Sequence, residues 1–165
     1  MKNMMKPCVL FFLLIINVTV LRAQAKNVEA DSSSINSMVD NKSFLFVATD
    51  VTPMSGKIRY LTSEYDLKVL PDTISTYLPY FGRVTNPGLA IVNGDGGIKF
   101  EATDFTYAVT NGKKGRKNIE INIKGNIDAY KLSLIVFPNK KANLFIVSNG
   151  RQPISYGGYI TEIKK

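Results

Sequence analysis

The segment Thr76–Val84, TYLPYFGRV, gathers side chains that could bind a ligand. Tyr80 and Phe81 offer flat aromatic faces, and Arg83 carries a planar fork of donors that suits a carboxylate, a phosphate or a sugar oxygen. The segment also has a structural interpretation, because Pro79 has no backbone N–H and is suited to a strand edge or a bulge. Clusters of aromatic residues with Pro and Gly usually serve packing in β proteins, so we prefer a corner that the fold requires.

A second segment, Ser148–Ile160, has the sequence SNGRQPISYGGYI. Arg151 follows an Asn-Gly pair, and two tyrosines, Tyr156 and Tyr159, flank two glycines. These features predict a hairpin turn followed by a terminal strand with a glycine bulge, which is the interpretation we prefer. The alternative is a shallow binding site shared by the two segments, whose candidate residues are Tyr80, Phe81, Arg83, Arg151 and Tyr156. It requires the side chains of Tyr80, Arg83, Arg151 and Tyr156 to lie in one contiguous, partly exposed patch.

The residue types of the chain exclude several classes of catalyst. The chain contains no histidine, and its single cysteine, Cys8, lies near the N-terminus. Beyond that region no Ser-His-Asp triad, no Cys-His pair and no thiolate or imidazole zinc site can form. A glycosidase needs two carboxylates at a set separation. Nothing marks such a pair among the acids near predicted turns or polar faces, which are Asp66, Asp72, Asp95, Glu101 and Asp104. We therefore expect a protein that is not an enzyme, with a carboxylate hydrolase as the alternative.

Two further motifs resemble ligand sites in part. NGDGG, Asn93–Gly97, alternates oxygen donors like a calcium loop, but Gly97 and Ile98 stand where a third ligand and a glycine are needed. KKGRK, Lys113–Lys117, is the densest charge in the chain and could contact phospholipid headgroups or other anionic envelope polymers. Because it lies between two predicted strands, we prefer a solvated hairpin tip. We predict no metal, no cofactor and no nucleic-acid partner.

The N-terminus has the layout of a secretory signal peptide, residues 1–25. Lys2 and Lys6 form a positive start, an apolar run covers residues 8–21, and small residues precede a cleavage site expected after Ala25. The run is shorter than the ~20 apolar residues that span a bilayer. Cys8 lies at the start of the run, whereas lipid anchoring needs a cysteine at the cleavage point after it. We predict an exported protein, periplasmic or extracellular, that is not a transmembrane protein.

The chain beyond the signal peptide has a length typical of one domain. It has no cysteine and therefore no disulfide, and its net charge from Lys26 onward is +5. Residues 26–34 are polar and predict a flexible tail, whereas residues 35–165 predict a single domain. The mild positive charge favours encounters with anionic surfaces.

The spacing of apolar residues predicts a mainly β fold with one short N-terminal helix. Ile35, Met38 and Val39 are spaced as on one face of a helix of two or three turns. From Phe44 onward apolar residues alternate as in half-buried strands, in SFLFVAT, TSEYDLKVL, TDFTYAVT, NIEINIK, AYKLSLIVF and ANLFIVS. The last of these is apolar on both faces, which predicts a central strand. Short turn signals separate the strands, so we predict an antiparallel β-sandwich or a partly open barrel.

The chain resembles the exported bacterial proteins grouped as domain of unknown function 4251 in three stretches: PMSGKIRYLTSEYDLKVLPDTISTYLPYFGRV, GDGGIKFEATDFTYAV and LFIVSNGRQPISYGGYI. The resemblance runs from about Ile35 to Ile163, and LPYFGR and SNGRQPISYGGYI are its most specific parts. It implies a secreted or envelope-associated protein of a Gram-negative gut bacterium, and it implies no activity. Family members often have a tryptophan in the strand where this chain has KGRKNIEINIK, so packing there is expected to differ.

These observations predict an exported, non-catalytic β domain that acts in the cell envelope. We expect it to bind a partner or an envelope component such as a glycan, a lipid or a protein. A purely structural envelope protein is a further alternative beside the carboxylate hydrolase.

Overall fold

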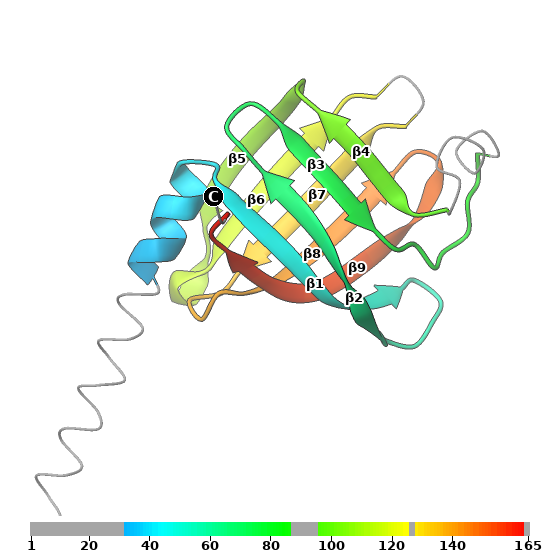
Figure 1. Cartoon of the computed structure of the whole chain (residues 1–165), viewed down its shortest axis with the longest axis horizontal. Helices are drawn as coiled ribbons and strands as arrows, with labels where there is room; N and C mark the ends of the chain where they lie inside the picture. Colours follow the sequence, from blue (N-terminus) through cyan, green and yellow to red (C-terminus); the bar gives the residue numbers. More distant parts are fainter. Residues whose placement is uncertain (1–31, 87–95, 126–127, 164–165) are drawn as a thin grey trace, which may run out of the picture.

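The computed structural model describes residues 32–86, 96–125 and 128–163. These residues form one α-helix, residues 32–40, and nine strands (Figure 1). The strands are β1 Phe44–Pro53, β2 Arg59–Val69, β3 Ile74–Leu78, β4 Ile98–Ala102, β5 Phe105–Asn111, β6 Lys117–Ile123, β7 Tyr130–Val136, β8 Lys141–Ser148 and β9 Arg151–Thr161. The predicted signal peptide, residues 1–25, and Asp95 of the NGDGG motif lie outside the described residues.

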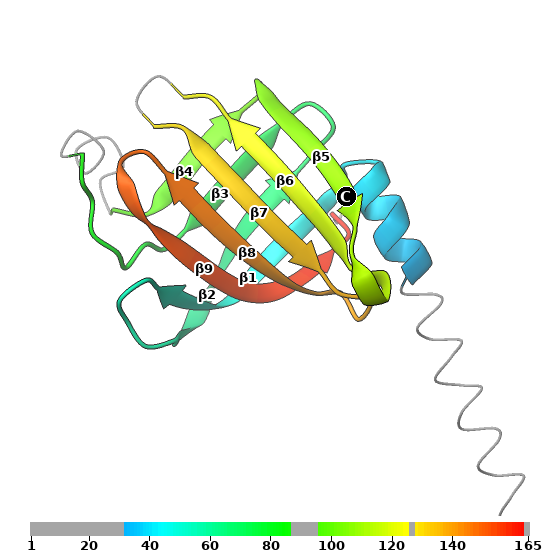
Figure 2. The same cartoon turned by 180° about the vertical axis from the view of Figure 1, so that it is seen from behind.

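The nine strands form one antiparallel sheet that curls into a nearly closed barrel (Figure 1, Figure 2). Their order is β4-β3-β2-β1-β9-β8-β7-β6-β5, so strands that are consecutive in the chain pair with each other, and β1 also pairs with β9. The two edge strands, β4 and β5, are joined by Thr103 and Asp104. Because so short a link spans on the order of 10 Å, it brings the two edges of the sheet together. The partly open barrel is therefore confirmed, rather than the sandwich.

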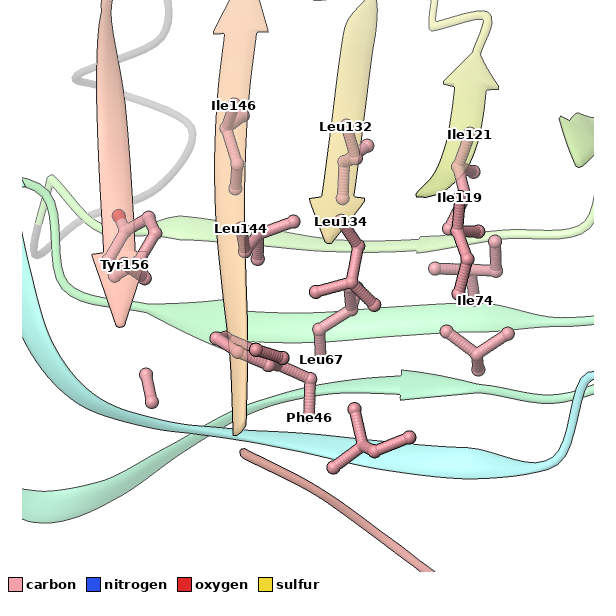
Figure 3. Packing of buried hydrophobic residues seen from close by; sticks show 14 of the residues in the cluster. Phe46, Leu67, Ile74, Ile119, Ile121, Leu132, Leu134, Leu144, Ile146 and Tyr156 are labelled. Carbon is pink, nitrogen blue, oxygen red and sulfur yellow. The ribbon is translucent and has the colours of Figure 1, made fainter. Parts of the chain in front are cut away.

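Apolar side chains fill the inside of the curled sheet (Figure 3). Leu67 of β2 points toward Leu134 of the opposite wall, Phe46 of β1 projects into the same interior, and all three are fully buried. Near one end, Phe100 of β4 stacks on Tyr130 of β7 with ring centroids 4.7 Å apart. Opposite walls of the sheet are thus in direct contact, and this shared core holds the barrel together.

The short N-terminal helix is confirmed. Ile35, Met38 and Val39 are buried as their spacing predicts, and the Tyr107 hydroxyl of β5 donates to the Val39 carbonyl oxygen at 3.0 Å. The helix begins at residue 32, so residues 32–34 of the predicted tail form its first turn. The Ser34 hydroxyl donates to Oε1 of Glu162, the residue after β9, at 3.4 Å. Within the described residues, no helix has the length and apolar character needed to cross a membrane.

Two strands, β3 and β4, are absent from those that the sequence predicts, whereas β9 is predicted from its turn and its glycines rather than from alternation. In β3 a polar residue, Thr76, occupies an inward position between Ile74 and Leu78. Its hydroxyl donates to the Asp66 carbonyl oxygen at 2.6 Å, which satisfies the polar atom inside the sheet. β4 has five residues, too few for a clear period.

The strand predicted to be central, β8, lies between β9 and β7. Its inward residues Leu144 and Ile146 are buried, whereas Phe145 and Val147 on its outer face are exposed. β8 is therefore apolar on both faces but buried on only one of them.

Candidate functional site

The segment that follows β3 runs beside the beginning of β9. Val84 forms an isolated β-bridge with Arg151, and the Gln152 amide donates to the Arg83 carbonyl oxygen at 3.1 Å. β1 pairs with β9 only as far as Pro53, so this segment takes the place of β1 beyond that point. The two segments singled out in the sequence therefore meet in space.

We call the place where residues 79–84 meet the beginning of β9 the corner. Two tyrosine hydroxyls stabilise it by hydrogen bonds to the backbone. The Tyr80 hydroxyl lies 2.9 Å from the Arg83 carbonyl oxygen and 3.0 Å from that of Gln152. The Tyr156 hydroxyl donates to the Pro79 carbonyl oxygen at 2.8 Å, and its side chain is 1% exposed. Each hydroxyl bonds to a carbonyl oxygen of the segment that follows β3, which is a structural role.

Arg151 is 4% exposed and lies within the corner. Its guanidinium carbon is 5.0 Å from the centroid of the Tyr80 ring, and its Nη1 donates to the Gly96 carbonyl oxygen at 2.7 Å. Its Nε and Nη2 have no hydrogen-bond partner among the described residues. Asp128 is also buried, and its Oδ1 accepts from two backbone amides of the β8–β9 turn. The corner thus contains buried groups of both charges.

Phe81 and Arg83 lie on the outside of the corner. Phe81 is 43% exposed, and the Arg59 guanidinium lies 4.7 Å from its ring centroid. The backbone of Arg83 pairs with β9 while its side chain is exposed. A side chain on Gly82 would collide with the Tyr80 hydroxyl, which explains the glycine. The structure thus brings Tyr80, Arg151 and Tyr156 together inside the corner. It leaves Phe81 and Arg83 at the surface of the corner. The binding role of these five residues stays a prediction.

Burial of tyrosines makes stability depend on alkaline pH. Burial, and secondarily the nearby Asp128 carboxylate, raises the pKa of Tyr130 to about 12, and burial also raises the pKa of Tyr107 and Tyr156. A raised pKa in the folded state stabilises the fold below the unfolded value of about 10. That stabilisation is lost as the pH rises from 10 toward 12.

We therefore expect part of the tyrosine absorbance change to appear only in strongly alkaline solution, together with loss of the folded circular dichroism signal. Spectrophotometric titration of the native and the denaturant-unfolded protein measures this difference. Identical titration curves for the two states would contradict it.

A second region that could bind a ligand is a groove of about 990 Å³ on the outer face of β1, β9 and β8. A row of paired residues crosses its floor, since Asp50 of β1 pairs with Gly157 of β9, which pairs with Asn143 of β8. Thr49 is the extra residue of a β-bulge in β1, and its hydroxyl lies 3.0 Å from Asp50 Oδ2. The bulge therefore fixes a carboxylate in the floor of the groove.

Two turns and one cross-strand pair form the walls of the groove. Lys114 and Arg116 come from the β5–β6 turn, which lies beside the β7–β8 turn (Figure 1, Figure 2). The Arg116 guanidinium is 5.6 Å from the centroid of the Phe137 ring of that second turn. Lys141 and Tyr159 pair across β8 and β9 and are both exposed. We call this region the basic groove; its polar and aromatic lining is Thr49, Asp50, Lys114, Arg116, Phe137, Asn139, Lys141, Asn143 and Tyr159.

Sequence reasoning did not identify the basic groove. The KKGRK motif does lie at a hairpin tip, as predicted, but two of its residues also line the groove.

The predicted glycine bulge differs in detail, because the extra residue is Thr49 in β1, opposite the glycines of β9. A Cβ on Gly157 would lie 2.5 Å from Asp50 Oδ2, and one on Gly158 would collide with the Val47 carbonyl oxygen. The Gly157-Gly158 pair is the feature of the sequence that could have indicated the groove, since it marks a close approach of two strands.

A smaller pocket of about 440 Å³ contains one of the five acids considered for catalysis. Asp66 lines it together with Glu64, Lys68 and Glu162. Burial raises the pKa of Asp66, Lys68 lowers it and Glu64 raises it further. Asp72, Glu101 and Asp104 do not line this pocket, and Asp95 lies outside the described residues. Over the described ranges, no group of three or more His, Cys, Asp or Glu side chains is placed to hold a metal ion.

Comparison with known proteins identifies the family. The family model for a domain of unknown function, DUF4251, matches residues 26–160. The crystal structure of a DUF4251 family protein from Bacteroides eggerthii is similar, with a TM-score of 0.63 and 17% sequence identity over 81% of this chain and 88% of that chain. At this identity the likeness shows a shared fold. No curated protein matches the chain. Because the family model covers most of the sequence, the chain belongs to the DUF4251 family.

Proposed function

We propose that this protein is an exported, non-catalytic β domain that binds a component of the cell envelope. The observation that carries the proposal is the basic groove, which combines three cations, one carboxylate and an exposed aromatic ring on one open surface. Apolar side chains fill the interior of the sheet. The outer face is therefore the place where a ligand has room to bind.

Export is supported by the signal-peptide layout of residues 1–25. A protein in the periplasm or outside the cell meets polysaccharides, lipids and other envelope proteins. Its net charge of +5 from Lys26 onward favours the anionic ones among them.

The non-catalytic part of the proposal is supported by residue types. No imidazole exists in the chain, and no thiol exists beyond Cys8, so the commonest general bases and nucleophiles are missing. A hydrolase with a carboxylate pair is the alternative, and Asp66 with Glu64 would be its starting point. A purely structural envelope protein is the other alternative.

The predicted corner site remains a second candidate contact surface. Phe81 and Arg83 would contact the ligand there, beside Arg59. Tyr80, Arg151 and Tyr156 would position them from below, through the hydrogen bonds to the backbone. A ligand at the corner and a ligand in the basic groove make different predictions for arginine variants.

A binding screen of the purified protein against envelope polysaccharides, lipids and peptidoglycan is expected to give at least one ligand. Arg116→Ala should weaken this binding about fivefold, since a surface ion pair is worth up to roughly 1 kcal/mol. Arg83→Ala removes a comparable exposed charge from the corner and should leave binding in the groove unchanged. Affinity is measured by surface plasmon resonance, with circular dichroism to show that each variant is folded.

The arginine variants also locate the site. Loss of binding in Arg83→Ala or Arg151→Ala, in a folded protein, would place the ligand at the corner instead of the groove. Turnover of any ligand, or failure to bind every class of envelope material, would overturn the proposed function.

A further inference from the structure

We propose that the basic groove binds an anionic glycan chain, namely a polysaccharide that carries carboxylate groups. This ligand class rests on the proposed function, because it specifies what the envelope component in the groove is. Three features of the groove carry the inference: the placement of its charges, its exposed aromatic ring and its concave shape.

The charges of the groove are divided between walls and floor. Lys114 and Arg116 project from the β5–β6 turn and Lys141 from the beginning of β8, so the cations come from two separate elements. Asp50 lies in the floor, within hydrogen-bond distance of the Thr49 hydroxyl. A carboxylate there repels a bare phosphate or sulfate but accepts hydrogen bonds from hydroxyl groups. The arrangement suits a chain with many hydroxyl groups along its length and acidic groups at its periphery.

The neutral lining of the groove also matches a sugar chain. Tyr159 is 44% exposed and pairs with Lys141 across β8 and β9, which places an aromatic ring beside a cation. An aromatic face packs against the apolar C–H face of a sugar ring, and an adjacent cation can then reach an acidic substituent. Asn143 offers an amide that both donates and accepts hydrogen bonds. Gly157, between Asn143 and Asp50, carries no side chain and leaves the middle of the floor open.

The shape of the groove distinguishes a glycan from a membrane surface. The groove, of about 990 Å³, is bounded by the two adjacent turns and floored by β1, β9 and β8, so a chain can lie along it. A lipid headgroup layer is flat and would contact only the tips of the turns. The groove therefore fits a discrete chain better than a bilayer.

Isothermal titration calorimetry with a galacturonate oligosaccharide tests the proposal, because its fully methyl-esterified form supplies the same sugar chain without the charge. The protein should bind the acidic form and not the esterified form. The double variant Lys114→Gln/Lys141→Gln should weaken binding about 25-fold, as expected for the loss of two surface ion pairs of roughly 1 kcal/mol each. The matched control Lys57→Gln/Lys124→Gln has the same net charge, lies outside the groove and should change affinity less than about twofold.

Tyr159→Ala separates sugar recognition from charge alone, and it should weaken binding of the acidic oligosaccharide without changing net charge. Equal losses in the two lysine double variants would overturn the proposal, since binding would then depend on overall charge. Binding to phosphatidylglycerol vesicles but not to the oligosaccharide would also overturn it, while leaving the proposed binding function intact. Failure to bind any envelope material would end both.

Discussion

Replacing Tyr156 with alanine is expected to lower the free energy of unfolding by about 3–5 kcal/mol, as for other large aromatic residues truncated in a core. The side chain is almost completely buried among the inward residues of the sheet. Tyr156→Phe keeps the ring but leaves the Pro79 carbonyl oxygen without its donor, so a loss of about 1–2 kcal/mol is expected. Urea unfolding followed by circular dichroism measures both values.

A tyrosine on the surface provides the control for this prediction. Tyr60 is 79% exposed, so Tyr60→Ala should change stability by less than about 0.5 kcal/mol. If Tyr156→Ala left stability unchanged but abolished ligand binding, Tyr156 would be a contact residue, as the shared-site hypothesis supposes. The large loss of stability is the result that the core position predicts.

Replacing Gly158 with alanine is expected to cost about 3 kcal/mol, at the upper end of the range for overpacked sites. The added Cβ would collide with the Val47 carbonyl oxygen and would approach Ala48 Cα to 3.1 Å. Both atoms belong to the backbone of β1, the strand to which β9 is paired. Relief of the collision requires the two strands to move apart at the pairing that joins the two halves of the barrel.

The neighbouring glycine is a matched comparison for Gly158. A Cβ on Gly157 would meet the carboxylate of Asp50, which is the end of a side chain and can rotate away. Gly157→Ala should therefore cost about 1 kcal/mol, and it should weaken ligand binding in the basic groove because Asp50 is displaced. Thermal unfolding of the two variants side by side gives the comparison. Equal destabilisation would contradict the different nature of the two contacts.

Much of the fold could be predicted from the sequence because its strands have one buried face. The alternation of Leu132, Leu134 and Val136 in β7 is an example, since each of these residues is fully buried. The prediction failed where an inward position is polar, as at Thr76, whose hydroxyl finds a backbone partner in the next strand. Periodicity counts such a residue as outward, although a hydrogen bond inside the sheet makes the inward position favourable.

The candidate sites could be predicted less well than the fold. The corner residues were identified by type, and the structure shows that their two segments meet, yet Tyr156 is in the core. The basic groove was not predicted because its lining comes from β1, the β5–β6 turn, the β7–β8 turn, β8 and β9. Each of those residues by itself is an ordinary surface residue.

By itself the sequence determined the mainly β fold, the helix of Ile35, Met38 and Val39, the family and the chemistries for which the chain has no residues. These properties depend on residue types or on neighbours a few positions apart. Only the tertiary structure decided that β1 pairs with β9 and that residues 83–85 continue this pairing along β9. It also decided that Lys114 and Lys141 line one groove. Such contacts join residues far apart in the chain, and they form because the whole apolar core is buried at once rather than because of any local pattern.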